Sequence, residues 1–452
     1  MEPVPVVGAG LAGSEAAWQL AEAGFRVRLH EMRPLVATPA HQSGRCAELV
    51  CSNSLGSRLP DRAAGVLQAG LRALGCKLLE LAEAHAVPAG QALAVDRDRF
   101  AQAVTDALEA HPGIEIVRGE VSAVPEDPVA VVASGPLTSE ALAQDLARLA
   151  GAAHLSFFDA IAPVVVADSL DRSVVFAASR WNKGQPDGGG DYLNVPLEKA
   201  HYEALVDGLL AAERHALKDF EAADPRAKVF FERCLPVEVL AGRGRDALRF
   251  GPLRPVGLDD PRTGRWPYAV IQLRAENRAA TLYNLVGFQT NLRYAEQERL
   301  LRALPGLAGA EFVRLGSMHR NTFLCSPRVL DATLEWRRRP GLFVAGQLTG
   351  MEGYLGNIGS GLLAGRNAVR RLRGGLLEVL PPETLLGALA RHVAEAPAEN
   401  FQPMKAEFGL LPSLPGRVSR DQRQRLRAAR SAEALLDHSR RHPMPAADPA
   451  TA

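Results

Sequence analysis

The sequence predicts an α/β protein in which one fold is assembled from the two ends of the chain, with a separate domain inserted between them. At the N-terminus, the apolar strand Val4 to Val7 enters a glycine turn, a helix that ends near Ala23, and a second alternating strand from Phe25 to Leu29. The continuously apolar run Val129 to Ser134 indicates a buried parallel strand. Near the other end, the strand Gly341 to Ala345 again leads into a glycine-rich stretch and a helix.

The remaining elements follow from local patterns. Arg33 to Pro60 is rich in Pro, Ser, Gly and Asn, which predicts a long loop of a kind that is uncommon unless functional. Leu67 to Ala84 and Arg99 to Ala110 have helical patterns, and so does a stretch from near Ser360 through Arg371. Near residue 156 the sequence changes character, and one clear helix is expected over Tyr202 to Leu217.

At 452 residues the chain exceeds what one hydrophobic core organises, so two or three domains are expected. The boundaries that we predict are 1–155 for the first part of the split domain, 156–310 for an inserted α+β domain on the substrate side, 311–375 for the second part, 376–440 for a helical C-terminal segment and 441–452 for a disordered tail.

Composition narrows the functional class. Lys plus Arg (52) nearly equals Asp plus Glu (51), so any RNA site must be a local patch. The N-terminus lacks the features of a secretory signal, and no apolar run approaches the roughly 20 residues of a membrane span, so a cytoplasmic protein without membrane contact is expected. Five cysteines without a close CxxC pair argue against both a disulfide framework and a metal site.

The glycine turn predicts a dinucleotide site. Gly8 permits a tight turn, Gly10 lets the backbone approach a pyrophosphate, and Gly13 allows close packing of helix on strand. The phosphates would lie at the helix N-terminus, where unpaired N–H groups favour anions. Glu31 ends the second strand, eighteen positions beyond Gly13, and is placed to accept a hydrogen bond from a ribose hydroxyl. The turn residues expected to hold the cofactor are Gly8, Ala9, Gly10, Leu11, Ala12 and Gly13.

The second glycine-rich stretch, Ala345 to Gly365, favours FAD over NAD. A second loop at a helix start can close over the flavin end of an extended FAD, whereas a dehydrogenase with one motif does not require it. A simple glycine-rich connector is the alternative. The candidate cofactor residues in this stretch are Gly346, Gln347, Gly350, Gly353 and Tyr354.

Two cysteines are candidates for catalysis. Cys51 lies in the long loop after the first βαβ unit, and Cys234 is followed by Arg243, Arg245 and Arg249, whose charges would favour a thiolate. From spacing alone, a small buried hydrophobic residue is the more frequent role of a cysteine. The arginines between 243 and 274 accompany Trp266 and Tyr268 and could form a phosphate-binding face; 337–339 and 417–430 are further basic runs, and each is more often a solvated surface.

Longer sequence segments identify a protein family more specifically than the short motifs above. The chain closely resembles the folate- and FAD-dependent tRNA uracil-5-methyltransferases of bacteria in several strings: GAGLAGSEAAWQLAEAGFRVRLHEMRP, AELVCSNSL, ALAVDRDRF, SGPLTS, FFERCLPVEVLAGRGRDALRFGPLRPVGL, NLVGFQTNLRYAEQERL, MHRNTFL, FVAGQLTGMEGY and FGLLP. These matches run in order from the first strand to about residue 415. The resemblance implies a Rossmann-like FAD-binding domain of the glutathione-reductase type.

The resemblance also implies an activity. The family methylates carbon 5 of uridine 54 in the T loop of tRNA, with 5,10-methylenetetrahydrofolate as one-carbon donor and NADH or NADPH as reductant through FAD. By motif, Cys234 is the nucleophile at carbon 6 of the uracil and Cys51 assists removal of the proton from carbon 5, although the two roles could be exchanged. Cys325 stands where a polar residue is expected and has no assigned role.

Three other functions compete with this interpretation: a small-molecule flavin oxidoreductase, a non-methylating tRNA-binding flavoprotein, and a partner subunit like the larger carboxymethylaminomethyl-modifying relatives. The sequence does not decide between NADH and NADPH or give the oligomeric state, and no obligate protein partner is inferred from it.

Overall fold

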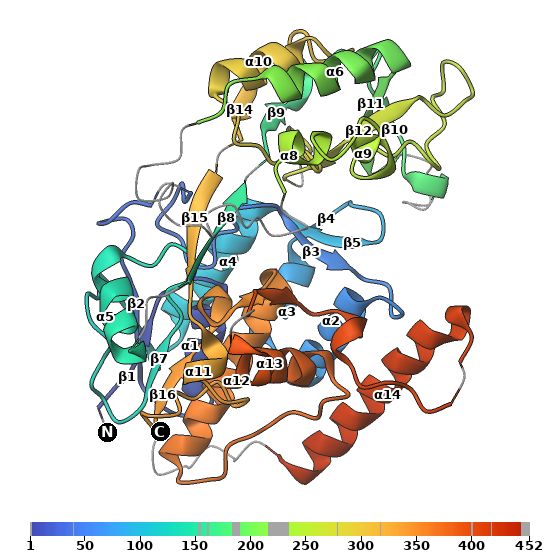
Figure 1. The fold of residues 1–452 in the computed structure, drawn as a ribbon. Helices are drawn as coiled ribbons and strands as arrows, with labels where there is room; N and C mark the ends of the chain where they lie inside the picture. Colours follow the sequence, from blue (N-terminus) through green and yellow to red (C-terminus); the bar gives the residue numbers. More distant parts are fainter. Residues whose placement is uncertain are drawn as a thin grey trace.

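The computed structural model describes residues 2–38, 40–151, 155–160, 162–182, 190–215, 235–277, 279–316, 318–398, 401–416 and 418–443. Figure 1 shows two lobes, one above the other. Strands β8 (Leu155–Ala160) and β15 (Met318–Phe323) pair antiparallel and form a two-stranded ribbon that joins the lobes. The lower lobe therefore contains both ends of the chain, and the segment between the two ribbon strands forms the upper lobe.

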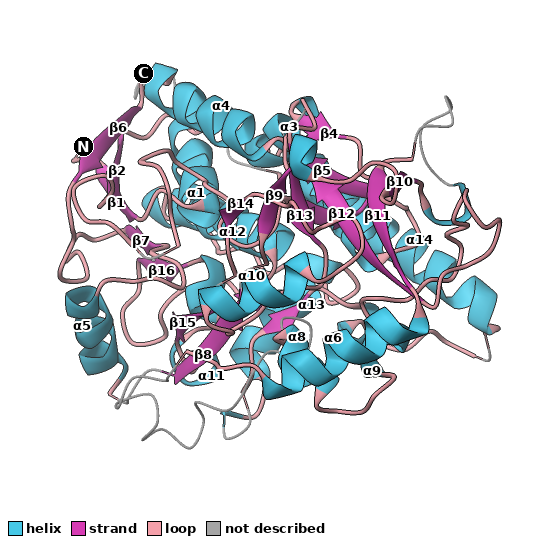
Figure 2. Cartoon of the chain, turned by 90° about the horizontal axis from the view of Figure 1, so that it is seen from above, coloured by secondary structure: helices cyan, strands magenta, loops and turns pink. Residues whose placement is uncertain are grey.

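The lower lobe is built on a parallel sheet of five strands. Its order is β16-β7-β1-β2-β6, which Figure 2 shows as a row. The strands are β1 (Val4–Val7), β2 (Val27–Glu31), β6 (Ile114–Arg118), β7 (Ala130–Val132) and β16 (Leu342–Val344). The strands near both ends of the chain thus meet in one sheet, which confirms the predicted α/β fold.

Helices cover both faces of this sheet. On one face, α1 (Leu11–Glu22), α4 (Arg97–Ala110) and α12 (Tyr354–Leu372) enclose a core with Val131 and Phe343, and on the other, α5 (Glu140–Ala150) packs near Trp336. Glycines allow α1 and α12 to pack closely against each other. A Cβ on Gly361 would lie 2.0 Å from the Ala12 carbonyl oxygen, and a Cβ on Gly365 would lie 2.9 Å from that of Ala16. Any side chain at these glycines would push the two helices apart.

Two sequence predictions are wrong in detail. The predicted helix over Leu67–Ala84 is two helices, α2 (Ala63–Ala73) and α3 (Lys77–Ala84), because Gly75 has a φ of +78° and ends the first. The buried carboxylate of Glu15 then caps α3 by accepting hydrogen bonds from the N–H groups of Lys77 and Leu78. The predicted helix start near Ser360 is also wrong, because α12 begins at Tyr354.

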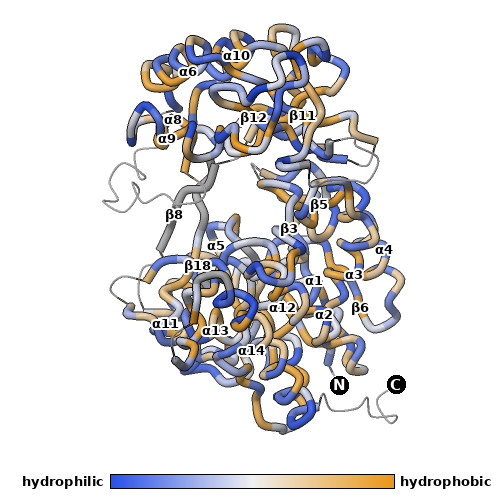
Figure 3. The backbone as a smooth tube through the Cα atoms, turned by 90° about the vertical axis from the view of Figure 1, so that its right-hand side faces the viewer, coloured by the Kyte–Doolittle hydropathy of each residue, from blue (hydrophilic) through white to orange (hydrophobic). Residues whose placement is uncertain are grey.

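The predicted loop from Arg33 to Pro60 contains one strand, β3 (Ser54–Ser57), which belongs to a small sheet of order β3-β5-β4. The other two strands of that sheet are β4 (Ala86–Val87) and β5 (Ala92–Val95). Figure 3 shows β3 and β5 of the lower lobe beneath the strand β11 of the upper lobe. This small sheet therefore forms the second side on which the lobes meet.

The upper lobe is a six-stranded sheet of order β10-β11-β12-β13-β9-β14. Its strands are β9 (Val164–Val166), β10 (Phe176–Ala177), β11 (Tyr192–Leu197), β12 (Ala269–Ala275), β13 (Leu282–Leu285) and β14 (Phe312–Arg314). Its helices are α6 (Lys199–Ala211), α8 (Val237–Ala241), α9 (Ala247–Phe250) and α10 (Tyr294–Arg302). The helix predicted over Tyr202–Leu217 is shorter than expected, since the Ala212 that follows α6 is already extended.

The two faces of the upper sheet differ in chemistry. Leu193, Ile271 and Leu285 belong to a core shared with α6, which is separate from the core of the lower lobe. The opposite face is polar. Cross-strand pairing places in one row the residues Tyr192, Arg274, Asn284, Val164 and Arg314. Because Arg274 Nε donates a hydrogen bond of 2.8 Å to Asn53 Oδ1 of the lower lobe, this polar face is the one that meets the lower lobe.

The C-terminal segment packs on the lower lobe. It contains α13 (Leu385–Glu395), the short strand β18 (Met404–Lys405) and α14 (Arg420–Arg441). β18 pairs in parallel with β17 (Met351–Glu352), and α13 packs against α11 (Ser326–Val329), both from earlier in the chain. Buried Glu378 anchors α14, because it accepts hydrogen bonds from Arg366 Nε (2.8 Å) on α12 and from His438 Nε2 (3.0 Å) on α14. The domain boundaries given above remain predictions.

This anchor predicts a pH-dependent stability. Burial lowers the pKa of His438 below its ordinary 6.5, although Glu378 favours the charged form. Below pH 6.5, His438 therefore binds a proton more readily in the unfolded chain than in the folded one. As the pH is lowered, the free energy of unfolding should decrease because of this group by at most about 1.4 kcal/mol per pH unit. We expect urea unfolding from pH 7 to 5 to show a smaller loss in His438→Gln than in the unmodified protein. Parallel curves for the two proteins would contradict the assignment.

Candidate functional site

A cavity lies at the carboxyl edge of the parallel sheet. All five strands contribute lining residues where they end: Gly8 after β1, Glu31 at the end of β2, Gly119 after β6, Ser134 after β7 and Gly346 after β16. The empty volume is about 970 Å³, part of it open to solvent, which lies within the range of roughly 300–1,000 Å³ of cofactor sites. Ligands of open parallel sheets bind at this edge, where the strand order reverses.

The glycine turn has the geometry of a phosphate cradle. Gly8 has a φ of +99°, and a Cβ on Gly13 would lie 1.7 Å from the Gly8 carbonyl oxygen, so neither position accepts a side chain. By contrast, a Cβ on Gly10 would meet no atom within 4 Å. Gly10 immediately precedes α1 and lines the cavity, so the open space beside it faces the helix N-terminus, where N–H groups favour a pyrophosphate. The turn therefore fits FAD.

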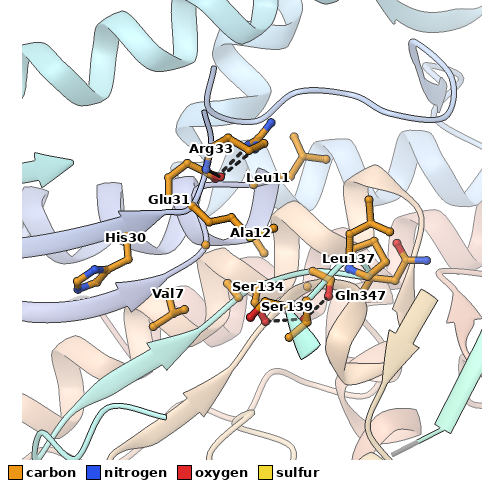
Figure 4. Close-up of a pocket in the computed structure, with 18 of the residues that line it drawn as sticks. Val7, Leu11, Ala12, His30, Glu31, Arg33, Ser134, Leu137, Ser139 and Gln347 are labelled. Carbon is orange, nitrogen blue, oxygen red and sulfur yellow. Dashed lines mark hydrogen bonds and ion pairs between the residues drawn. The ribbon is translucent and has the colours of Figure 1, made fainter. Parts of the chain in front are cut away.

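Glu31 lies on the cavity wall with its charge fixed (Figure 4). Its carboxylate accepts hydrogen bonds from the Ala9 backbone N–H (3.2 Å) and from Arg33 Nε (2.8 Å) and Nη2 (3.0 Å). Burial alone would raise the pKa of Glu31, but the hydrogen bonds and charge of Arg33 outweigh burial and the pKa is lowered. The backbone N–H of Ala9 therefore fixes the Glu31 carboxylate beside the glycine turn. A ribose hydroxyl would donate a hydrogen bond to the same carboxylate that Arg33 contacts.

The second glycine-rich stretch forms the opposite end of the cavity. Gly346, Gln347 and Tyr354 line it, and the Gly346 N–H donates a hydrogen bond of 2.7 Å to Ser360 Oγ. Gly350 and Gly353 do not line the cavity. A Cβ on Gly350 would lie 2.6 Å from the Phe401 ring, so this glycine makes room for packing within the lobe.

Tyr354 links this cavity to Cys51. Its hydroxyl oxygen accepts hydrogen bonds from the backbone N–H groups of Cys51 (2.9 Å) and Ser52 (3.1 Å), and burial raises its pKa well above the ordinary value, so the phenol stays neutral. Asn53 fixes the same loop from the other side, because its Nδ2 donates a hydrogen bond of 2.8 Å to the Ala275 carbonyl oxygen. The loop that carries Cys51 is thus held between the two lobes at the wall of the cavity.

Charged groups from both lobes surround this loop. Arg97 donates to Glu276 Oε2 from Nε (3.0 Å) and from Nη2 (2.7 Å), and to the Leu49 carbonyl oxygen. Burial lowers the pKa of Arg314, Arg97 lowers it further, and Glu276 and Cys51 oppose the effect. Among the buried side-chain atoms of the described residues that have no hydrogen-bond partner, four lie on the residues of this polar face or at its edge: Glu276 Oε1, Asn284 Nδ2, and Nε and Nη2 of Arg314. Orphaned polar atoms at one place on a sheet indicate a site for a polar ligand.

The other cysteines differ from Cys51. Cys234 lies outside the described residues. Cys46 is fully buried, and burial raises the pKa of its thiol to about 11. Cys76 is buried beside Glu15, which accepts a hydrogen bond from its sulfur at 3.4 Å. The Cys325 thiol donates to the Ala398 carbonyl oxygen at 3.6 Å. No cluster of three or more His, Cys, Asp or Glu side chains suited to a metal ion occurs among the described residues.

Comparison with known proteins decides the family. Residues 3–375 match the family model described as GIDA, glucose inhibited division protein A. A protein of Synechococcus sp. (strain JA-2-3B'a(2-13)) named methylenetetrahydrofolate–tRNA-(uracil-5-)-methyltransferase TrmFO is 55% identical over 94% of this chain and 90% of its own length. A TrmFO of Geobacter sulfurreducens is 54% identical over 96% of this chain and 98% of its own. The chain belongs to the TrmFO family. The resemblance noted in the sequence is thereby confirmed.

A solved structure shows the same fold. Aquifex aeolicus GidA in its form II crystal superposes with a TM-score of 0.68 at 17% sequence identity, over 96% of this chain and 73% of that chain. This likeness concerns the fold and agrees with a Rossmann-type domain built from both ends of the TrmFO-family chain. Among the described residues, no helix is both long and apolar enough to cross a membrane.

Tyr354 offers a test of the Cys51 loop. In Tyr354→Phe, the N–H groups of Cys51 and Ser52 lose their shared acceptor, at a cost of about 1–3 kcal/mol for each N–H that stays buried and unpaired. We expect FAD to remain bound, while turnover falls roughly 10-fold and Cys51 becomes more accessible to alkylation. Tyr294→Phe, at a tyrosine that is 51% exposed on α10, is the control. Unchanged turnover in Tyr354→Phe would show that this loop needs no such support.

Proposed function

We propose that this protein methylates carbon 5 of uridine 54 in the T loop of tRNA and forms ribothymidine. The one-carbon donor is 5,10-methylenetetrahydrofolate, and NADH or NADPH is the reductant. The observation that carries the proposal is the identity of 52–55% over more than nine-tenths of the chain to proteins named methylenetetrahydrofolate–tRNA-(uracil-5-)-methyltransferase. Bound FAD supplies the hydride-transfer chemistry that converts a methylene unit to a methyl group.

The chain supplies the groups that hold FAD. Gly8 to Gly13 and the N-terminus of α1 would take the pyrophosphate, and Glu31 would take the ribose. Gly346, Gln347 and Tyr354 would lie along the flavin end. The glycine turn supports this assignment, because its one open Cβ position, Gly10, faces the cavity.

Carbon 5 of uracil is a weak nucleophile, which explains the need for two thiols. Addition of the Cys234 thiolate to carbon 6 turns the ring into an enolate whose carbon 5 can attack an electrophilic one-carbon unit. The Cys51 thiolate then removes the proton from carbon 5 as the nitrogen that carried the one-carbon unit leaves, which forms an exocyclic methylene. Hydride from the reductant adds to this methylene carbon, and the Cys234 sulfur leaves carbon 6 as the carbon 5–carbon 6 double bond forms again. The Cys51 loop at the cavity wall, next to Arg97 and Arg314, supports its part, since nearby guanidinium groups favour a thiolate.

The assay is methylation of a tRNA transcript that lacks modifications. The transcript is incubated with the FAD-loaded protein, 5,10-methylenetetrahydrofolate labelled in its methylene carbon, and NADH or NADPH, and the nucleosides are separated. We expect label in ribothymidine at position 54, and none when S-adenosylmethionine labelled in its methyl carbon replaces the folate.

Two other results would each favour a competing function. Oxidation of NAD(P)H by the flavoprotein without label in tRNA points to a small-molecule oxidoreductase. Tight binding of tRNA without label points to a flavoprotein that holds RNA but does not modify it. Either result would refute the proposed activity.

A further inference from the structure

Two tryptophans lie exposed as a pair on the upper lobe. Trp181 is 60% exposed and Trp266 is 46% exposed, and their ring centroids are 5.7 Å apart with an interplanar angle of 86°. The whole chain has only four tryptophans, so half of them lie together on this surface. Large apolar side chains that gather on a surface mark an interaction site more often than single ones do.

The backbone holds this pair in place. Trp181 has a φ of +59°, in the left-handed region, and its N–H donates a hydrogen bond of 2.8 Å to the Gly257 carbonyl oxygen. A Cβ on Gly257 would lie 2.8 Å from the indole of Trp181, so only glycine leaves room for the ring. Trp266 follows the bridge between Asp260 and Arg265. A bulky residue kept in a strained conformation while its ring stays exposed indicates a functional constraint.

The segment of the chain that carries Trp266 is positively charged. Residues 243–274 contain seven arginines and three aspartates, a net charge of +4 in a chain whose total is +1. Arg245, Arg249 and Arg262 pair with aspartates. Arg254 and Arg265 are exposed and form no ion pair with any residue that the structure describes. These two guanidinium groups are therefore available to an anion.

A chain of polar contacts runs from this surface toward Cys51. Arg180, next to Trp181, donates to the carbonyl oxygens of Arg254 (2.6 Å) and Val256 (2.7 Å) and to Gln272 Oε1 (3.0 Å). Gln272 lies on β12 two residues before Arg274, on the polar face that meets the Cys51 loop. The aromatic pair is thus on the edge of the sheet face that closes over the candidate active site.

We propose that Trp181, Trp266, Arg254 and Arg265 form a tryptophan surface that binds unpaired nucleotides of the tRNA substrate. The indoles stack on bases, which requires no particular sequence, and the arginines contact phosphates. The charge of this segment favours RNA over a second copy of this nearly neutral chain. The inference rests on the proposed function and adds the place where the RNA is held during methylation.

The test measures tRNA affinity in variants of the FAD-loaded protein. In Trp181→Ala/Trp266→Ala, we expect the Kd for an unmodified tRNA transcript to rise about 10-fold or more and KM to rise more than kcat falls. In Arg254→Gln/Arg265→Gln, the slope of log affinity against log salt should decrease by about one to two. The control variant is Tyr294→Ala, which removes an exposed aromatic ring from α10 of the same lobe. It should bind tRNA with the affinity of the unmodified protein. FAD content and the Tm of each variant report whether the fold is intact.

Two results would overturn the inference. One is a Kd within twofold of the unmodified protein in the tryptophan variant. The other is a change of oligomeric state in that variant by sedimentation, which would make this surface a contact between copies. Both can occur while the unmodified protein methylates tRNA, so failure of this inference is distinct from failure of the proposed function, which appears as absent methylation by the unmodified protein.

Discussion

Gly10→Ala is expected to fold normally and to lose most of its affinity for FAD. An added methyl group at this position meets no protein atom within 4 Å, so the turn itself tolerates it. The methyl group would occupy the cavity at the N-terminus of α1, where the pyrophosphate must approach the backbone. We expect the Kd for FAD to rise at least about 10-fold, which corresponds to about 1.4 kcal/mol. Fluorescence titration of the apoprotein measures this change.

Two other glycine variants serve as controls for Gly10→Ala. Gly13→Ala places a methyl group 1.7 Å from the Gly8 carbonyl oxygen and should lower the Tm of the apoprotein as well as FAD binding. Gly409→Ala adds a methyl group in open space remote from the turn and should change neither. If Gly10→Ala bound FAD as tightly as the unmodified protein, the pyrophosphate would not lie against this turn.

Cys51→Ala and Cys234→Ala are each expected to abolish methylation while FAD stays bound. Loss of a proton-removing group costs about 10²–10⁴-fold in rate, and loss of a nucleophile that forms the covalent adduct costs on the order of 10³-fold or more. The two should fail at different steps. With 5-fluorouridine in the tRNA, Cys51→Ala should still form a covalent protein–RNA adduct, and Cys234→Ala should form none. The reverse result would exchange the two roles.

Cys46→Ala is the control within the same loop. The Cys46 thiol is fully buried, and its raised pKa of about 11 keeps it protonated at neutral pH. We expect this variant to be somewhat less stable and to methylate tRNA at the normal rate. Full activity in both Cys51→Ala and Cys234→Ala would remove the proposed mechanism.

The parts of the fold that depend on local sequence were predictable. Val4–Val7, the turn Gly8–Gly13 and Glu31 are close in sequence and form one βαβ unit, so periodicity and glycine spacing were sufficient. The start of α12 could not be predicted in this way, because glycine has a low helix propensity and Gly356 and Gly359 therefore favour a loop. In the structure a Cβ on Gly359 would lie 2.9 Å from Leu386, so this glycine serves close helix packing, which is a tertiary effect.

The candidate site was predictable only in part. Cys51 and Tyr354 were singled out by motif, but the hydrogen bond that joins them spans 303 positions. Arg97, Glu276 and Arg314 were not singled out. They come from a helix, a strand end and a different strand, and only the register of the upper sheet and its contact with the lower lobe bring them together. The SGPLTS run after β7 was the one local signal for further cavity residues, since Ser134 and Thr138 lie in it.

In the proposed mechanism, a flavin ring and the Cys51 thiol meet in one pocket between the lobes. A crystal structure of the protein with FAD bound tests this most directly. We expect the pyrophosphate against Gly10 at the N-terminus of α1, and the isoalloxazine ring beside Tyr354 and the Cys51 sulfur, with Cys234 facing the same space. An isoalloxazine ring that points away from Cys51, or FAD bound elsewhere than this cavity, would contradict the account.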